Sequence, residues 1–296
     1  METILSINSI SKSYGPIQAL KNVSFNVPQG SVFGILGPNG SGKTTMLGII
    51  LDVLKADAGT YQWLGGTPNA EARRSIGSLL ETPNFYHYMT AWDNLEIAAA
   101  IKQHGKDDRQ AVLEKTGLWQ RKSSKFKTFS LGMKQRLAIA STLLGNPDVL
   151  VFDEPTNGLD PAGIAEIREL IMQLNREGKT IIMASHLLDE VEKVCTHVAI
   201  LKRGDLLLSG KVDEVLVSED QVEVSATDIP ALLSIISAMP GIHNVKQING
   251  ALQLNCDSHI TPAQVNEYCM QNGIALSHLA LRKKSLETKF MELTNK

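Results

Sequence analysis

The segment Gly37–Thr45, with the sequence GPNGSGKTT, constrains the fold of this chain more than any other segment. It follows the apolar run SVFGILG (31–37), which predicts a buried strand, and precedes the apolar run MLGIILDVL (46–54), which predicts a helix. Residues 37–44 fit the pattern G-x-x-x-x-G-K-[ST], in which glycines let backbone N–H groups turn inward around phosphate oxygens. A strand, a glycine-rich loop and a helix in this order predict a nucleotide-phosphate site in an α/β fold.

Two side chains of this loop have distinct expected roles. The ammonium of Lys43 can interact with the β- and γ-phosphates of a nucleotide, and the Thr44 hydroxyl can bind Mg²⁺. The whole loop is expected to surround the phosphates, so the predicted nucleotide contacts are Gly37, Pro38, Asn39, Gly40, Ser41, Gly42, Lys43, Thr44 and Thr45. The strand-to-helix context argues against a chance match to the pattern.

A second segment, LVFDEP (150–155), ends a short apolar strand with two carboxylates. Asp153 is placed to bind Mg²⁺ through water, and Glu154 could accept a proton from the water that attacks the γ-phosphate. Acidic residues also end strands without any catalytic role, but after a phosphate loop the catalytic interpretation is favoured. His186 closes the strand KTIIMASH and could donate to the γ-phosphate, because α/β proteins bind ligands at the C-terminal ends of strands. A purely structural histidine fits equally well.

A second helix start that could bind an anion lies far from the loop. Ser130 can cap a helix, and Gly132 leaves its first turn accessible to a phosphate. The helix would bury one apolar stripe, formed by Met133, Leu137, Ala140 and Leu144. An ordinary helix start explains the same residues.

The order of the remaining elements predicts an α/β core with a largely parallel sheet. An antiparallel sheet precedes this core, and a helical insertion occupies about residues 90–146. A helix from Pro161 to Gly178 is strongly indicated by the N-cap Asp160. Beyond 216–221 the order strand-helix-strand-strand-helix-strand predicts a ferredoxin-like module, with elements at 222–225, 229–239, 243–248, 251–256, 261–272 and 274–281, and a last helix at 285–294.

Composition narrows the class of protein. The chain has 296 residues, enough for one large and one smaller domain, and its net charge of −2 gives no general attraction to nucleic acid. Cys195, Cys256 and Cys269 form no CxxC pair, which favours reduced thiols in a cytosolic protein. The N-terminus lacks a signal-peptide pattern, and no apolar run approaches the roughly 18 residues of a membrane span. We expect membrane contact only through a partner.

Together these segments resemble the ATP-binding cassette (ABC) family over residues 1 to about 216. The sequence FSLGMKQR resembles its signature motif, with Phe129–Met133 at positions that are commonly Leu-Ser-Gly-Gly-Gln. The sequence NGLD (157–160) is similar to the D-loop, and His186 is similar to the switch histidine. Tyr14 matches the aromatic residue that stacks on adenine in the family, although a surface tyrosine is equally compatible with the sequence.

The resemblance implies an ATPase subunit of an ABC transporter with a P-loop NTPase cassette at 1–216 and a small C-terminal α+β domain at 217–296. The cassette would contain a mixed sheet, an antiparallel β subdomain and a helical subdomain. ATP would be the substrate and Mg²⁺ the cofactor. Two cassettes, identical or closely related, would dimerise so that Ser130, Gly132 and Asp160 of one chain reach the ATP of the other. A transmembrane permease would be the partner at the cytoplasmic face of the cell membrane, with no role for nucleic acid.

Two departures from the family pattern narrow the resemblance. Glu81, in IGSLLETPNFY, stands where the family usually has the glutamine that senses Mg²⁺ and couples to the membrane subunit. A carboxylate can still offer an oxygen to Mg²⁺. Leu131 stands where glycine is common. Both features resemble the subgroup that serves exporters of bacitracin-type and lantibiotic peptides.

Two other functions remain open. One is a non-transport cassette ATPase acting on ribosomes or DNA, although such relatives usually carry two cassettes or a long coiled-coil insertion. The other gives the C-terminal domain the main role, as a ligand-binding module that regulates the cassette. Among smaller signals, RGD (203–205) predicts a hairpin turn. The basic cluster of Arg121, Lys122, Lys125 and Lys127 predicts a solvated face, with a role near phosphates or anionic lipid as the alternative.

Overall fold

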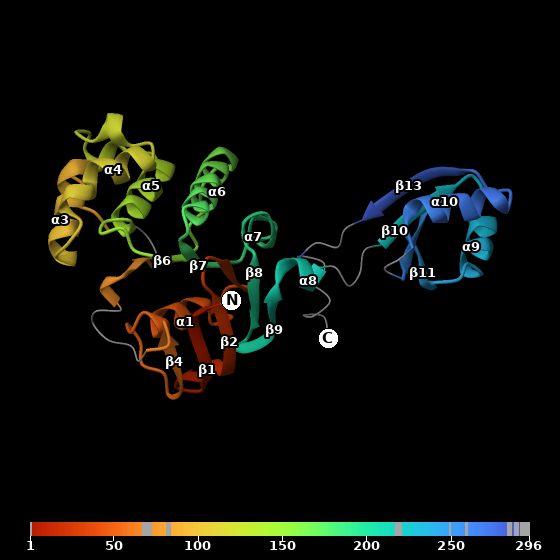
Figure 1. The fold of residues 1–296 in the computed structure, drawn as a ribbon, viewed down its shortest axis with the longest axis horizontal. Coiled ribbons are helices and arrows are strands. Elements are labelled where there is room, and N and C mark those ends of the chain that lie inside the picture. Colours follow the sequence, from red (N-terminus) through yellow and green to blue (C-terminus); the bar gives the residue numbers. More distant parts are fainter. Residues whose placement is uncertain are drawn as a thin grey trace. The chain divides into compact units, whose positions relative to one another are not determined.

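The protein is described here by a computed structural model. The described residues are 2–66, 73–80, 84–216, 221–248, 250–257, 260–282, 286 and 290. They form two compact units, Met1–Lys211 and Val212–Lys296 (Figure 1). The division falls slightly before the boundary near 216 that the sequence predicts. Glu81 and most of the predicted last helix lie outside the described residues.

A six-stranded mixed sheet forms the centre of the N-terminal unit, with the strand order β5-β6-β7-β3-β8-β9. These strands are β5 (Ile76–Leu79), β6 (Val149–Asp153), β7 (Thr180–Ser185), β3 (Val32–Leu36), β8 (His197–Lys202) and β9 (Asp205–Lys211). All neighbours are parallel except β8 and β9. Every residue of β3, β6 and β7 is buried, which explains why these strands are continuous apolar runs. The predicted mixed sheet is confirmed.

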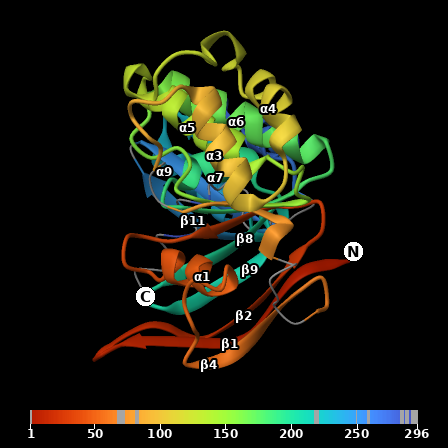
Figure 2. The same ribbon diagram turned by 90° about the vertical axis from the view of Figure 1, so that its left-hand side faces the viewer.

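A smaller antiparallel sheet covers one side of this unit. It has the order β2-β1-β4, with β1 at Thr3–Tyr14, β2 at Ile17–Pro28 and β4 at Ala58–Trp63. Helix α1 (Lys43–Ile50) lies between the two sheets, as Figure 2 shows. One hydrophobic core joins the three layers and includes Ile7, Leu20, Ile35, Met46, Leu47 and Val151. The start of α1 is therefore fixed by packing on both sides.

The remaining helices of this unit group into two regions. The helical insertion contains α3 (Ala91–Lys102), α4 (Arg109–Lys115) and α5 (Leu131–Thr142), with 3-10 turns at 106–108, 119–121 and 126–128. Helix α6 (Pro161–Arg176) begins at the predicted cap Asp160, and α7 (Leu188–Val194) follows β7. Figure 2 shows α3, α4 and α5 clustered on the opposite side of the central sheet from β1, β2 and β4. Within the described part of the chain, no helix is both long and apolar enough to span a bilayer.

The C-terminal unit has a four-stranded sheet with two helices on it. Its elements are α8 (Val212–Leu216), β10 (Gln221–Ala226), α9 (Ile229–Ser237), β11 (Ile242–Ile248), β12 (Ala251–Cys256), α10 (Pro262–Gln271) and β13 (Leu276–Arg282). The strand order is β11-β12-β10-β13 and every neighbouring pair is antiparallel. This order, with β-α-β-β-α-β along the chain, is a ferredoxin-like arrangement. A separate core includes Val222, Leu232, Ile236, Leu254 and Val265.

A largely buried lysine closes the C-terminal end of α5. Lys102, at the end of α3, donates from Nζ to the carbonyl oxygens of Ser141 (2.9 Å), Thr142 (3.1 Å) and Leu144 (3.5 Å). Ser141 and Thr142 lie in the last turn of α5, whose carbonyl groups have no intrahelical partners, and Leu144 follows the helix end. Burial lowers the pKa of Lys102 from 10.5 to about 8. The contact between α3 and α5 therefore titrates at mildly alkaline pH.

This pKa predicts a pH dependence of stability. Between the folded pKa of about 8 and the unfolded pKa of 10.5, the unfolded chain retains a proton that the folded chain has released. The free energy of unfolding should therefore rise with pH in this window, by up to about 3 kcal/mol, relative to a Lys102→Met variant. Urea unfolding of both proteins at pH 7.5 and pH 10 measures the difference. Burial raises the thiol pKa of Cys195 and Cys269, but this contribution is common to both proteins and cancels. If the free energy of unfolding changed equally with pH in both proteins, the lowered pKa of Lys102 would be contradicted.

Candidate nucleotide site

The phosphate loop joins β3 to α1 and leaves the start of that helix open. Gly42, the N-cap of α1, has a φ of 107° and offers no side chain to the helix N–H groups. A Cβ on Gly42 would lie 2.4 Å from the Ala19 carbonyl oxygen, and a Cβ on Gly37 would lie 2.2 Å from that of Leu201. Glycine is therefore required at both positions. The N–H groups and the positive end of the α1 dipole remain available to a phosphate.

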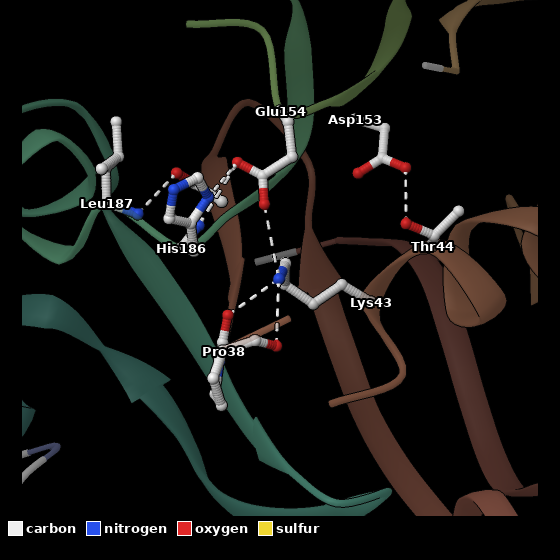
Figure 3. A network of polar contacts seen from close by, with 9 residues as sticks. Pro38, Lys43, Thr44, Asp153, Glu154, His186 and Leu187 are labelled. Atoms are coloured by element: carbon white, nitrogen blue, oxygen red, sulfur yellow. Dashed lines mark hydrogen bonds and ion pairs between the residues drawn. The ribbon is translucent and has the colours of Figure 1, made fainter. Parts of the chain in front are cut away.

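Lys43 is the central polar group of the site (Figure 3). Its side chain is only 6% exposed. Its Nζ donates to the carbonyl oxygens of Gly37 (2.8 Å) and Pro38 (3.3 Å) and lies 3.4 Å from Glu154 Oε1. A buried ammonium is tolerated only with hydrogen-bond and charge partners. These contacts therefore hold the loop and the Glu154 carboxylate in one arrangement.

Glu154, directly after β6, is positioned by its backbone and by His186. Its φ of 48° lies in the left-handed region that non-glycine residues seldom adopt. Its N–H donates to the Ala184 carbonyl oxygen of β7 at 3.0 Å. The second carboxylate oxygen, Oε2, lies 2.8 Å from His186 Nδ1. Figure 3 shows the carboxylate between Lys43 and His186, so the three residues predicted to act on the γ-phosphate lie together.

The two predicted Mg²⁺ ligands within the described residues are in contact. Thr44 Oγ1 donates to Asp153 Oδ2 at 2.8 Å, which links the first turn of α1 to the end of β6. Hydroxyl and carboxylate oxygens are ligands that Mg²⁺ prefers, and nucleotide-bound Mg²⁺ takes few protein ligands besides phosphates and water. The donor set therefore fits the ion. The third predicted ligand, Glu81, falls outside the described residues.

A pocket of about 470 Å³ opens beside the loop. Its walls are formed by Tyr14, Ile17, Gln18, Ala19, Asn39, Gly40, Gly42, Lys43, Thr44, Thr45, Glu154 and Arg203. The pocket thus joins the predicted adenine contact, Tyr14, to the predicted phosphate contacts. Gly37, Pro38 and Ser41 are not among its wall residues. Gly37 and Pro38 instead hold Lys43, and Ser41 is buried.

Arg203 is a pocket residue that the sequence analysis missed. The RGD segment forms the predicted turn between β8 and β9, but the turn also reaches the nucleotide pocket. Gly204 N–H donates to the Ser41 carbonyl oxygen at 3.1 Å, and Lys21 N–H donates to the Gly204 carbonyl oxygen at 2.8 Å. These bonds fix the turn against the phosphate loop. The sequence shows only that Arg203 is a cation in a turn. Its position at the pocket depends on the pairing of β8 with β3, which the sequence does not show.

Three predicted nucleotide contacts lie away from this pocket. Ser130 caps α5 by accepting the Met133 N–H at 3.3 Å, and Asp160 caps α6 by accepting the Gly163 N–H at 3.0 Å. Ser130 and Asp160 are exposed, and a Cβ on Gly132 would meet open space. None of the three lines the pocket of its own chain. An ion pair between Arg136 and Glu166 (3.6 Å) links α5 to α6.

Comparisons with known proteins agree with this geometry. The family described as ABC transporter matches residues 20–157. The uncharacterised ABC transporter ATP-binding protein YhcH of Bacillus subtilis is 35% identical over 99% of this chain and 97% of its own length. The bacitracin transport ATP-binding protein BcrA of Bacillus licheniformis is 36% identical over 99% of this chain and 98% of its own length. The lantibiotic transport ATP-binding protein SrtF of Streptococcus pyogenes is 38% identical over 71% of this chain and 92% of its own length.

A solved structure supports the same fold and reaction. It is a dimeric ATP-binding cassette in a post-hydrolysis state, bound to ADP and Pi. It is 30% identical to this chain, with a TM-score of 0.62 over 70% of this chain and 98% of its own length. The phosphate loop, the paired carboxylates and these matches establish that the chain belongs to the ABC transporter family, as an ATP-binding and ATP-hydrolysing subunit.

Proposed function

We propose that Glu154 is the general base of ATP hydrolysis and that Lys43 and His186 contact the γ-phosphate. The observation that carries this proposal is the Lys43–Glu154–His186 network. Each carboxylate oxygen of Glu154 has one of the other two residues as its partner. The carboxylate is therefore oriented before a nucleotide binds, and an oriented base is worth more than a mobile one.

The phosphate loop and its neighbours would bind the rest of the nucleotide. Backbone N–H groups of residues 37–45 would hold the phosphates, and Tyr14 would stack on adenine. Thr44 and Asp153, together with Glu81, would hold Mg²⁺, which supplies positive charge to the phosphates when bound. The Lys43 ammonium adds a second positive charge at the same place.

We further propose that the catalytic site is shared between two chains. Ser130 and Asp160 are exposed, and Gly132 is half-buried. All three lie outside their own pocket, although each belongs to a helix start that can donate N–H groups or accept a hydrogen bond. Charge that develops on the phosphoryl group is best stabilised by donors arranged in advance on its open side. A second cassette, identical or closely related, would provide them.

A groove in the helical insertion is the proposed docking site for a transmembrane permease. It has a volume of about 380 Å³ and lies between the segment 84–86 and α3, where its walls include Phe85, Tyr86, Ile97 and Ile101. Tyr86 is 50% exposed and Ile101 78% exposed, so an apolar partner surface would remove both from water. Glu81 shortly precedes this groove in sequence. Docking here would hold the chain at the cytoplasmic face of the cell membrane.

The direction and cargo of transport are proposed from the relatives. The bacitracin and lantibiotic transport proteins lead us to propose export of a peptide of that kind. The match to the lantibiotic protein covers 92% of that protein but only 71% of this chain. This difference supports a catalytic cassette at 1–216 and an accessory domain at 217–296 that is not part of the ATP site.

The base assignment predicts the behaviour of Glu154→Gln. Hydrolysis should fall by at least about a hundredfold because the amide cannot accept the proton, whereas ATP binding should persist because the amide keeps the size of the side chain. Phosphate release and nucleotide binding by the purified variants measure the two effects. Glu169→Gln, on the surface of α6, is the matched control and should hydrolyse ATP normally. Normal hydrolysis by Glu154→Gln would refute the assignment.

The shared site predicts complementation between two inactive variants. Lys43→Ala disables the phosphate loop and Ser130→Arg disables the opposing helix start, so each homodimer should be inactive. In a mixed dimer, one site combines both defects and the other has neither. Mixing equal amounts should restore roughly a quarter of the wild-type rate, from random pairing of two chains into dimers with one working site. Chains that complete their own sites would give no recovery on mixing.

Arg203 predicts a separate effect on affinity. Arg203→Gln should weaken ATP binding roughly threefold to tenfold by removing a cation from the pocket wall, and should affect adenosine less because adenosine lacks phosphates. Arg203→Lys should retain most of the affinity. Calorimetric titration measures each dissociation constant, with Arg176→Gln on the surface of α6 as the control. Equal affinities in all variants would exclude Arg203 from nucleotide binding.

A further inference from the structure

A group of basic side chains in the helical insertion is not used by the nucleotide site. We call Arg121, Lys122, Lys125, Lys127 and Lys134 the basic strip. Among the residues that the structure describes, none of these five forms an ion pair, whereas neighbouring Arg109 is paired with Glu96 at 3.0 Å. Five unpaired cations close together repel one another, and a negatively charged partner would relieve that repulsion.

Backbone hydrogen bonds fix the strip beside the proposed permease groove. Residues 122–127 run alongside residues 87–92, with an antiparallel bridge between Thr90 and Lys125. Four bonds join them: Lys127 N–H to His87 O (3.0 Å), Phe126 N–H to Met89 O (2.9 Å), Ala91 N–H to Ser124 O (3.1 Å) and Trp92 N–H to Lys122 O (3.0 Å). Residues 87–92 also follow Tyr86 of the groove wall directly in sequence.

Aromatic side chains accompany the cations on this surface. Tyr88 is 68% exposed, and its ring meets that of Tyr86 edge-on at 6.0 Å. The rings of Trp92 and Trp119 meet edge-on at 6.2 Å, and Lys122 Nζ lies 3.4 Å from the Trp119 ring centroid. Tryptophan, tyrosine and basic side chains together are the combination that is enriched at the polar boundary of a bilayer.

A pocket of about 500 Å³ lies between these tryptophans, and Thr90, Asp93, Lys122 and Ser123 complete its walls. Its one carboxylate, Asp93, is engaged in the capping box of α3, where it accepts the Thr90 hydroxyl at 2.6 Å and the Thr90 N–H at 3.2 Å. That carboxylate is thus directed at the helix start. The pocket offers a cation, hydroxyls and aromatic rings to a ligand.

We propose that the basic strip and the tryptophan pocket bind the anionic headgroups of the bilayer that surrounds the permease. The proposal rests on the proposed docking groove, because a permease seated there would bring its surrounding lipid to the adjacent strip. Nucleic acid is the less favoured partner, since the chain as a whole carries a net charge of −2 and the cations are interleaved with aromatic groups beside an apolar groove. Each basic residue near an anionic surface contributes measurably to binding, and the contributions add.

Vesicle co-sedimentation of the full chain tests the proposal without the permease. The probes are vesicles of phosphatidylcholine mixed with phosphatidylglycerol and vesicles of phosphatidylcholine alone. The chain should bind the mixed vesicles, and the triple variant Arg121→Gln/Lys125→Gln/Lys127→Gln should bind them about a hundredfold more weakly. The matched control removes the same charge from exposed positions elsewhere and is the triple variant Lys55→Gln/Arg74→Gln/Lys246→Gln. It should bind the mixed vesicles as tightly as the wild-type chain does. Raising the salt concentration should weaken wild-type binding.

Three results would overturn the proposal. The first is equal binding of the wild-type chain to both kinds of vesicle. The second is an equal loss of binding to the mixed vesicles in the two triple variants. The third is tighter binding of a duplex oligonucleotide than of the mixed vesicles. ATP hydrolysis in solution separates this test from the proposed function. The strip variant should hydrolyse ATP at the wild-type rate, which also shows that it is folded. Inactive wild-type protein that still binds mixed vesicles would refute the ATPase mechanism and leave the lipid surface intact.

Discussion

The buried ammonium of Lys43 is the interaction on which the rest of the site depends. It is held by two carbonyl oxygens of its own loop and by Glu154, which follows a different strand. Because a charge cannot stay buried without partners, the shape of the loop and the position of the carboxylate stabilise each other. His186, directly after the end of β7, completes the arrangement. A phosphate that enters the pocket would meet an ammonium already positioned by the packing of α1 between two sheets, so little ordering is left for nucleotide binding to accomplish.

The pocket and the exposed helix starts would have different tasks in the proposed shared site. One chain provides a pocket whose walls include both Tyr14 and Thr44. The exposed helix starts at Ser130 and Asp160 lie elsewhere on the same chain, joined through α5 and α6. Binding and hydrolysis therefore make different demands on assembly. In the proposed shared site, one chain would bind the nucleotide and a second chain would supply the donors that stabilise the transition state. In such a shared site, ATP would be hydrolysed only when the assembly is closed, and the nucleotide would control the assembly.

The parts that the sequence predicts correctly depend on local chemistry. The strand-loop-helix order around Lys43 and the caps Ser130 and Asp160 are encoded within a few neighbouring residues, and the structure contains all of them. Arg203 and Lys102 were not recognised because their surroundings come from residues far along the chain. Arg203 reaches the pocket since β8 pairs with β3, and Lys102 is buried since α3 packs on α5. Sheet order and helix packing are properties of the whole fold, which no motif records. Glu81, which the sequence analysis expects at the position of the usual glutamine, lies outside the described residues.

The helical insertion places the proposed permease groove, the basic strip and the signature helix start on one short stretch of backbone. Residues 87–92 border the proposed groove and pair with residues 122–127, and the chain then reaches Ser130 through one 3-10 turn at 126–128. Lys102, at the end of α3, also binds carbonyl oxygens at the far end of α5. A displacement imposed at the groove would be passed through these backbone hydrogen bonds to residues 122–127, which lie a few residues before the start of α5. If a permease docks in the proposed groove, this short stretch of backbone is the path by which it would act on the serine that would complete the partner's ATP site.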